Sequence, residues 1–183
     1  WGQMPSPGMA FNQLQMFPCE LTLRSTADGP RLAWQPVKEI EMLRTRSHRA
    51  GPLTLAEGAA NPLAQISAEL LEIRADFTPV AGSELLLKVR GVEIRCDAAK
   101  QEISVGGQRA LAPLREGRQS LVVLADRTSL TVWASDGLTY VPLPVIPKAG
   151  DLGVEVSVRG GPVALQKLDV HELKSIWETK PAG

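Results

Sequence analysis

Apolar and polar residues alternate with a period of two over most of this chain. In residues 17–24 the odd positions are apolar and the even positions are polar or proline, a pattern typical of a half-buried β-strand. Asp28 and Gly29 have the chemistry of a tight turn, so residues 31–35 are predicted to return as the second strand of a hairpin. Glu20 is then predicted to point away from the packed face.

A different spacing follows the hairpin. Pro36 opens the stretch "PVKEIEMLR", in which Val37, Ile40 and Leu43 fall at helical spacing. Proline suits the first turn of a helix because its fixed φ is already helical and its missing N–H has no partner there. We therefore predict a short linker helix within residues 36–46.

From about residue 45 the chain resets into many short strand patterns separated by Gly, Asp, Asn or Pro. Their spacing of about 8 to 14 residues is typical of an antiparallel sandwich or barrel. The predicted strands are "PLTLAE", "SAELLEIRADF", "SELLLKVRG", "VEIRC", "EISVGG", "SLVVLAD", "TSLTVWAS", "LTYVPLPV", "LGVEVSV" and "VALQKLDVHEL". Gly106-Gly107 and Asp136-Gly137 are the strongest turn signals among them.

Charge and composition narrow the classes of partner. The 183 residues contain 20 Lys and Arg against 20 Asp and Glu, so no net charge attracts the chain to nucleic acid or to an anionic membrane. No apolar run approaches the length of a membrane span, and the first residues lack the pattern of a signal peptide, so the sequence leaves the compartment undetermined. Because the first residue is Trp1, we expect that sequence preceded it.

Metal and cofactor chemistry has little support in the sequence. The two histidines are far apart: His48 is predicted to lie in a solvated polar linker, and His171 with Asp169 on a polar strand face. Cys19 and Cys96 are predicted to remain unpaired thiols. Neither a nucleophile motif nor a phosphate-binding glycine loop occurs. The sequence predicts no cofactor and no metal.

Paired carboxylates need separate consideration, because glycosidases use two of them and their spacing is set by the fold. The candidates are Glu20, Glu39, Glu41, Asp126 and Asp136. Each has a structural explanation, since the pattern places them on a strand exterior, on an exposed helix face or in turns. Sugar-binding surfaces usually expose aromatic rings, but this chain has only four Trp, three Phe and one Tyr. Trp133 fits a core position better than an exposed platform.

Three stretches together resemble glycoside hydrolase family 32, which contains levanases, inulinases and invertases. Residues 12–44, "NQLQMFPCELTLRSTADGPRLAWQPVKEIEMLR", are similar to the end of the family's catalytic propeller, where a Pro-x-Glu-Leu-x-Leu strand precedes a hairpin and a Pro-Val-x-Glu linker. Residues 121–137, "LVVLADRTSLTVWASDG", resemble a strand ending in Asp-Arg-Ser-Ser, followed by Val-Glu-Val-Phe and an Asp-Gly turn, in its C-terminal module. The end, "VHELKSIW", fits the last strand of that module.

The resemblance implies an all-β fold, namely an antiparallel two-sheet β-sandwich of the concanavalin-like or jelly-roll-like kind, preceded by a hairpin from a five-bladed propeller. The chain departs from the family pattern at several positions. Cys19 stands where Arg is common, and Thr128, Thr131, Trp133 and Ser135 replace the commoner Ser, Glu, Phe and Asn.

The family's catalytic motifs are missing from this sequence. The resemblance places the nucleophile in an Asn-Asp-Pro motif, the transition-state stabiliser in Arg-Asp-Pro and the acid/base in a Glu-Cys pair. The chain contains no Asp-Pro, and its neighbouring Cys19 and Glu20 run in the reverse order. Glu20 corresponds to the Glu of the late propeller strand, so we predict no catalytic residue and no cofactor-binding or metal-binding residue.

These observations predict three parts: residues 1–35 as a remnant of the last propeller blade, residues 36–46 as the linker helix and residues 47–183 as the C-terminal β-sandwich module. The expected function is a non-catalytic module that supports the catalytic propeller of a fructan- or sucrose-hydrolysing enzyme. The alternatives are a fructan-binding module and a chain with intrinsic glycosidase activity. The expected partners are the propeller, fructan or sucrose, and a second copy that pairs through the hairpin.

Overall fold

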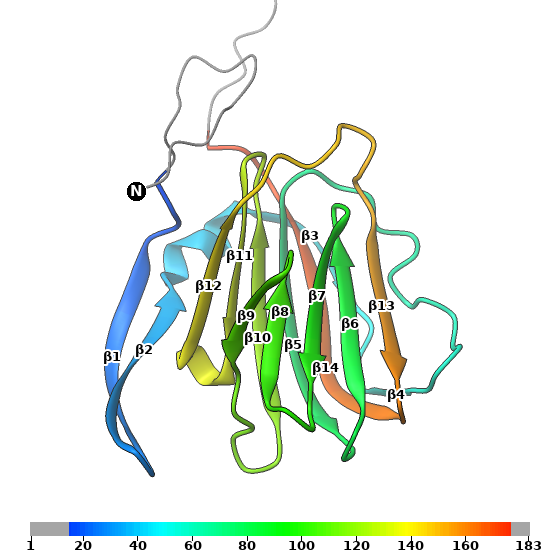
Figure 1. The fold of residues 1–183 in the computed structure, drawn as a ribbon. Helices are drawn as coiled ribbons and strands as arrows, with labels where there is room; N and C mark the ends of the chain where they lie inside the picture. Colours follow the sequence, from blue (N-terminus) through cyan, green and yellow to red (C-terminus); the bar gives the residue numbers. More distant parts are fainter. Residues whose placement is uncertain (1–14, 177–183) are drawn as a thin grey trace, which may run out of the picture.

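The computed structural model describes residues 15–176, and the strands in this part of the chain pair in antiparallel fashion (Figure 1). The first elements are β1 (Cys19–Thr26), β2 (Gly29–Pro36), the 3-10 helix η1 (Lys38–Leu43), β3 (Arg44–Arg49), β4 (Leu53–Leu55), β5 (Leu71–Pro79), β6 (Glu84–Val89) and β7 (Val92–Asp97). The remaining elements are β8 (Glu102–Val105), β9 (Gln108–Leu111), β10 (Gln119–Ala125), β11 (Ser129–Ala134), the 3-10 helix η2 (Ser135–Gly137), β12 (Thr139–Pro144), β13 (Val154–Arg159) and β14 (Val163–Leu173).

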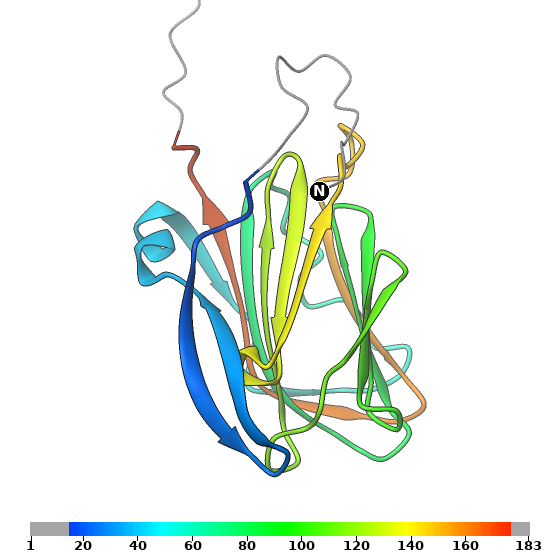
Figure 2. The same ribbon diagram turned by 60° about the vertical axis from the view of Figure 1, so that its left-hand side comes forward.

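Two sheets pack face to face, and the hairpin lies outside them. The seven-stranded sheet has the order β12-β11-β10-β5-β14-β3, with β4 also paired to β14, and the five-stranded sheet has the order β13-β6-β7-β8-β9. Figure 2 shows both sheets nearly edge on, with β1 and β2 against the side of the seven-stranded sheet that faces away from its partner. The predicted antiparallel two-sheet sandwich is confirmed.

The core lies between the two sheets, because strand alternation places one apolar face of each sheet inward. Ile73 and Phe77 of β5, Val123 of β10, and Ile94 of β7 are almost completely buried there. Burial of one such side chain stabilises the fold by roughly 1.5–3 kcal/mol. The repeated alternation in the sequence therefore supplies most of the apolar surface that holds the sheets together.

One extra residue in β14 changes which side chains point outward. The pairing of β14 with β5 shifts between Leu165 and Lys167, so Leu165 pairs with Phe77 and Lys167 with Asp76. A β-bulge of this kind reverses the alternation beyond it. Leu165 and Leu168 consequently both face the core, and Lys167 is directed to the outer face beside Asp76.

The predicted linker helix is shorter and tighter than expected. It is the six-residue 3-10 helix η1, and residues 44–46 already belong to strand β3. The 37-40-43 spacing explains this, because residues three apart align on one side of a 3-10 helix, which has three residues per turn. Only Ile40 of the helix is buried. The same result corrects the prediction for His48, which lies in β3 rather than in a solvated linker.

The hairpin is confirmed, but its apolar face is not fully covered. Leu21 of β1 pairs with Trp34 of β2, and Leu23 pairs with Leu32. Cross-strand partners share a face, so these side chains form one apolar stripe. Leu21, Leu23 and Leu32 are exposed, Leu23 to 71%. The prediction that the odd positions of residues 17–24 face a packed surface is therefore wrong for Leu21 and Leu23. Residues 1–14 of the predicted propeller remnant lie outside the described part of the chain.

Candidate functional site

The outer face of the seven-stranded sheet carries both apolar and charged side chains. Strand register aligns them in rows that cross the sheet. Two rows run from β12 to β3: Pro142, Thr131, Leu124, Glu72, His171 and Ser47; and Tyr140, Trp133, Val122, Arg74, Asp169 and Arg49. The face is thus apolar at its β11 and β12 side and charged at its β5, β14 and β3 side.

The apolar half of this face is covered by η1 and the hairpin. Ile40, Leu124 and Trp133 form a second buried cluster, against which Trp34, Tyr140 and other residues pack. The rings of Trp34 and Tyr140 stack with centroids 5.2 Å apart, and Tyr140 also meets Trp133 at 5.7 Å. Aromatic pairs at these distances add about 0.5–1.5 kcal/mol beyond the area that they bury. The prediction that Trp133 is buried is confirmed, although it lies in the cluster on the outer face of the sheet, with Ile40 and Leu124, and not in the core between the sheets.

Cys19 is enclosed by the same cluster. Burial raises the pKa of its thiol, and the nearby indole N–H of Trp133 partly opposes this effect. That N–H has no hydrogen bond of ordinary geometry within the described residues. Cys19 and Cys96 are both free thiols, as predicted.

A glycine allows the hairpin to come this close. Gly137 in η2 has φ +90°, and a Cβ there would lie 2.3 Å from the Trp34 carbonyl oxygen and 2.8 Å from Gln35 Nε2. Both conditions favour glycine, because it tolerates positive φ and leaves room for a neighbouring backbone. Gly137 of the predicted Asp136-Gly137 turn therefore also leaves the space in which the hairpin packs.

The charged half of the face is centred on Glu72, which is only 1% exposed. Arg44 donates from Nε and Nη2 to its two carboxylate oxygens at 2.6 and 2.8 Å, and Arg74 Nε donates at 2.6 Å. Burial alone would raise the pKa of Glu72, but the hydrogen bonds from Arg44 and Arg74 outweigh it and the pKa lies below its usual value. Arg44 and Arg74 also approach Glu41 of η1 at 3.2 and 3.5 Å, which ties the linker to the sheet.

Both histidines lie near this network. His171 is on the predicted face with Asp169, but it is buried, and its Nδ1 lies 2.8 Å from Ser47 Oγ. Burial and the charge of Arg44 lower its pKa. His48 Nε2 lies 2.7 Å from Glu172 Oε1. Each histidine has a hydrogen-bonding partner in the sheet, which favours a structural role.

A pocket of about 160 Å³ opens between the hairpin and the outer face. It is lined by Gln35, Arg74, Asp76, Ser120, Leu121, Val122, Trp133, Asp136, Gly137 and Lys167. Ser120, Asp76 and Lys167 are cross-strand neighbours on β10, β5 and β14. Sequence reasoning missed Asp76 and Lys167, because only the β14 bulge brings them side by side.

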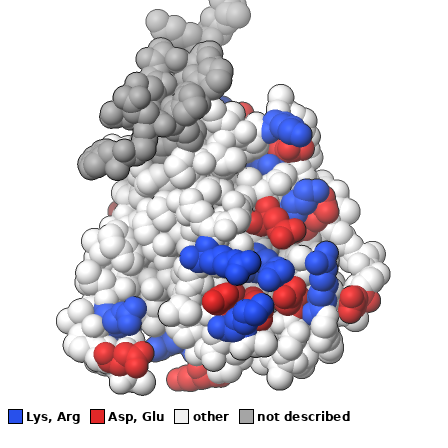
Figure 3. All heavy atoms as spheres, in the orientation of Figure 1, with Lys and Arg blue, Asp and Glu red and all other residues white. Residues whose placement is uncertain are grey.

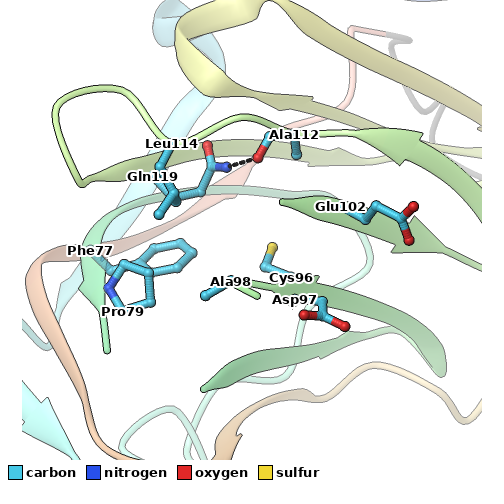
Figure 4. Close-up of a pocket in the computed structure, with 9 residues that line it drawn as sticks. All are labelled: Phe77, Pro79, Cys96, Asp97, Ala98, Glu102, Ala112, Leu114 and Gln119. Atoms are coloured by element: carbon cyan, nitrogen blue, oxygen red, sulfur yellow. Dashed lines mark hydrogen bonds between the residues drawn. The ribbon is translucent and has the colours of Figure 1, made fainter. Parts of the chain in front are cut away.

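A second, much smaller cavity lies between the sheets near Cys96 (Figure 4). Its volume is about 10 Å³, close to the space of one water molecule. Gln119 and Ala112 both line it, and Gln119 Nε2 donates to the Ala112 carbonyl at 2.9 Å. Burial raises the pKa of the Cys96 thiol to about 12, so this thiol is inert near neutral pH and the cavity belongs to the core.

The five-stranded sheet presents a different outer surface. Figure 3 shows positive and negative side chains interspersed over β6, β7, β8 and β13. Lys88 pairs with Glu155 at 3.2 Å, and Arg95 with Glu84 at 3.7 Å. Exposed pairs of this kind contribute little to stability and suit a surface in contact with water.

The carboxylates singled out from the sequence do not form one group. Glu20 is exposed on β1, and Glu39 and Glu41 are exposed on η1. Asp126 directly follows β10, and its Oδ1 accepts from the Arg127 N–H at 2.7 Å. Asp136 alone among these candidates lines the larger pocket, where Asp76, which was not a candidate, joins it.

Two other features bear on function. Among residues 15–176, no three His, Cys, Asp or Glu side chains are grouped closely enough to hold a metal ion. The helices in this part of the chain are too short to span a bilayer.

The fold and the hairpin-covered face define a β-sandwich module that holds a segment of polypeptide against one of its sheets. Similarity to known proteins agrees with this class. A levanase of Bacillus subtilis (strain 168) is 28% identical over 198 residues, covering 96% of this chain and 29% of the levanase. A levanase of Bacillus sp. (strain L7) is 27% identical over 188 residues, covering 90% and 20%. The chain thus spans less than a third of the length of these curated relatives.

Solved structures share the fold. The exo-inulinase from Aspergillus awamori superposes with a TM-score of 0.78 at 19% identity, covering 94% of this chain and 38% of that one. Fructan 1-exohydrolase IIa from Cichorium intybus superposes with a TM-score of 0.62 at 15% identity, covering 84% and 40%. No protein-family model matches the chain. The levanase relatives and these structural neighbours support a glycoside hydrolase family 32 C-terminal module.

Proposed function

We propose that this chain is a non-catalytic part of a fructan-hydrolysing glycosidase, and that its sandwich supports the catalytic propeller of that enzyme. The packing and exposure of the hairpin support this proposal. Its Trp34 packs on Tyr140 of the sandwich, which also contacts Trp133, while Leu21 and Leu23, on the same face of the hairpin as Trp34, remain exposed. A hairpin whose apolar face is only partly covered by the sandwich is suited to contact a second body with the remainder of that face.

Similarity to levanases supports the fructan part of the proposal, since the relatives of this chain are named for that activity. In this arrangement the ion pairs of Arg44 and Arg74 with Glu41 and Glu72 fix the linker against the sandwich. The linker in turn sets the angle between the sandwich and the propeller that precedes it.

Asp76 and Asp136 both line the larger pocket. Because glycosidases work with two carboxyl groups, these two residues are the ones at which a glycosidase site in this pocket would be tested.

Purified protein tests the non-catalytic role directly. We expect no release of fructose from sucrose, levan or inulin above the buffer level. Fructose release that disappears in Asp76→Asn or Asp136→Asn would overturn the proposal, because it would place a glycosidase site in this chain.

The supporting role is tested in the longer reading frame that encodes the propeller. Removal of residues 46–183 should lower the melting temperature or the soluble yield of the enzyme. The hairpin would then lose the sandwich face on which it packs. A truncated enzyme with an unchanged melting temperature would contradict this role.

A further inference from the structure

The pocket between the hairpin and the seven-stranded sheet has features of a binding site. Its floor is formed by β10, β5 and β14, and one wall by Gln35 of β2 and by η2. Its volume of about 160 Å³ holds on the order of ten waters, which is enough for one hexose ring. Its polar groups come from five separate elements, so the tertiary fold assembles it.

Backbone strain positions one of these groups. Ser135 and Asp136 have φ values of 54° and 55°, which cost energy for residues other than glycine. Gln119 Oε1 accepts from the Ser135 N–H at 2.7 Å, and Ser120 Oγ accepts from the Asp136 N–H at 2.8 Å. Ser120 Oγ also donates to Asp136 Oδ1 at 3.0 Å. These bonds hold the Asp136 carboxylate at the pocket.

Two further side chains in the pocket, Gln35 and Asp76, differ from these groups in their hydrogen bonding. Among the described residues, the side chains of Gln35 and Asp76 take part in no hydrogen bond or ion pair, although both line the pocket. Gln35 can donate and accept, and an ionised Asp76 can only accept. These groups are therefore available to a ligand.

The charges of the lining select the class of ligand. Asp76 and Asp136 disfavour an anion, and Arg74 and Lys167 disfavour a cation, so the lining is balanced overall. Carboxylates accept from hydroxyl groups, and Arg, Lys and Gln donate to them. Val122 and Trp133 supply apolar surface beneath these groups. We propose that this pocket binds one uncharged sugar residue through its hydroxyl groups.

Sugar binding at this pocket would be a function beyond support of the propeller. The scarcity of aromatic residues predicts no sugar-binding platform, and Trp133 is too buried to stack on a sugar ring. Recognition here would rest on hydrogen bonds to hydroxyl groups within a small pocket. A single ring held in this way binds weakly, so the affinity is expected in the millimolar range.

Amide chemical shifts of the 183-residue protein provide the test, with D-fructose, D-glucose and sucrose as separate probes. We expect saturable shifts at Gln35, Asp76, Ser120, Asp136 and Lys167 with at least one sugar. Asp76→Ala should weaken that sugar about tenfold, because a hydrogen bond to a charged group is lost. Lys167→Met is a second variant on the same floor and should weaken binding as well.

Glu155→Gln is the matched control, since Glu155 is an exposed residue of β13 in the other sheet, and this variant should bind as the parent does. Each variant is first shown to keep the dispersed spectrum of the folded chain. Absence of saturable shifts with all three sugars would overturn the inference, as would unchanged affinity in both Asp76→Ala and Lys167→Met. Tighter binding of phosphate or calcium at the same amides would also overturn it. Hydrolysis is measured separately, so a failure here leaves the non-catalytic role intact.

Discussion

Trp133 lies on the face of β11 that points away from the sandwich core, yet it is only 1% exposed. Residues on β11 alternate between the core cluster, with Leu130 and Val132, and the cluster under the hairpin, with Trp133. A strand covered on both faces loses the apolar and polar alternation from which burial is read. The sequence could therefore predict that Trp133 is buried, but not which surface covers it.

Glu72 illustrates the opposite case, a charged residue that the alternation places on an outer face but that is buried. Glu72→Gln should lower the free energy of unfolding by about 2 kcal/mol at pH 7, because charge-assisted hydrogen bonds from Arg44 and Arg74 are lost. Urea unfolding measures the change. Glu155→Gln, at a glutamate whose side chain is exposed to 63%, should cost less than about 0.5 kcal/mol.

The pH dependence of the free energy of unfolding tests the same hydrogen bonds to Glu72. The pKa of Glu72 is lower in the folded chain than in the unfolded chain, so its contribution is present above the ordinary Glu pKa of about 4.3. That contribution is lost as the pH falls through the lower folded pKa. The difference between the parent and Glu72→Gln should therefore shrink at acid pH. An equal difference at pH 7 and at pH 3 would contradict the ionic origin of the effect.

At the scale of elements, the hairpin and η2 depend on each other through one glycine. Gly137→Ala should displace the hairpin, because its Cβ would meet the Trp34 carbonyl at 2.3 Å. We expect a loss of several kcal/mol of stability, together with a change in near-ultraviolet circular dichroism as the stacked Trp34 and Tyr140 rings separate.

Gly107→Ala is the matched control. Gly107 has φ +89°, almost the same as Gly137, but a Cβ there would meet no atom within 4 Å. It should cost only the backbone penalty, about 1–2 kcal/mol, and leave the aromatic signal unchanged. Equal costs for the two variants would show that the hairpin contact is not stabilising.

Element boundaries show what local patterns can predict. The hairpin turn at Asp28-Gly29 and the turn at Gly106-Gly107 lie where their chemistry predicts, between β1 and β2 and between β8 and β9. The strand β3 was missed, because "RTRSHR" has no apolar alternation. It forms because β14 pairs with it along that edge, so the partner strand decides its conformation.

At the scale of the whole molecule, the exposed leucines of the hairpin predict self-association. Leu23→Lys should shift the protein toward monomer at high concentration, because it places a charge in the apolar stripe of the hairpin. Sedimentation or small-angle scattering measures the change. Leu111→Lys, at a leucine exposed to 73% on β9, should leave the association unchanged. A parent protein that is monodisperse and monomeric at high concentration would contradict the prediction.

The pocket could not be predicted at any smaller scale. Gln35, Asp76, Asp136 and Lys167 are spread over 133 positions of the chain, and no spacing links them. Three tertiary features bring them together: the β14 bulge, the positive-φ turn of η2 and the packing of the hairpin. The sequence did single out Asp136, but as a turn residue.

By itself, the sequence determined the β class, the hairpin, most of the strands and the family resemblance. These follow from local alternation and turn chemistry, in which each residue acts with its near neighbours. The tertiary structure alone decided the burial of Glu72 and His171, the double coverage of β11 and the larger pocket. Those features depend on which outer faces are covered, and contacts between distant segments control that coverage.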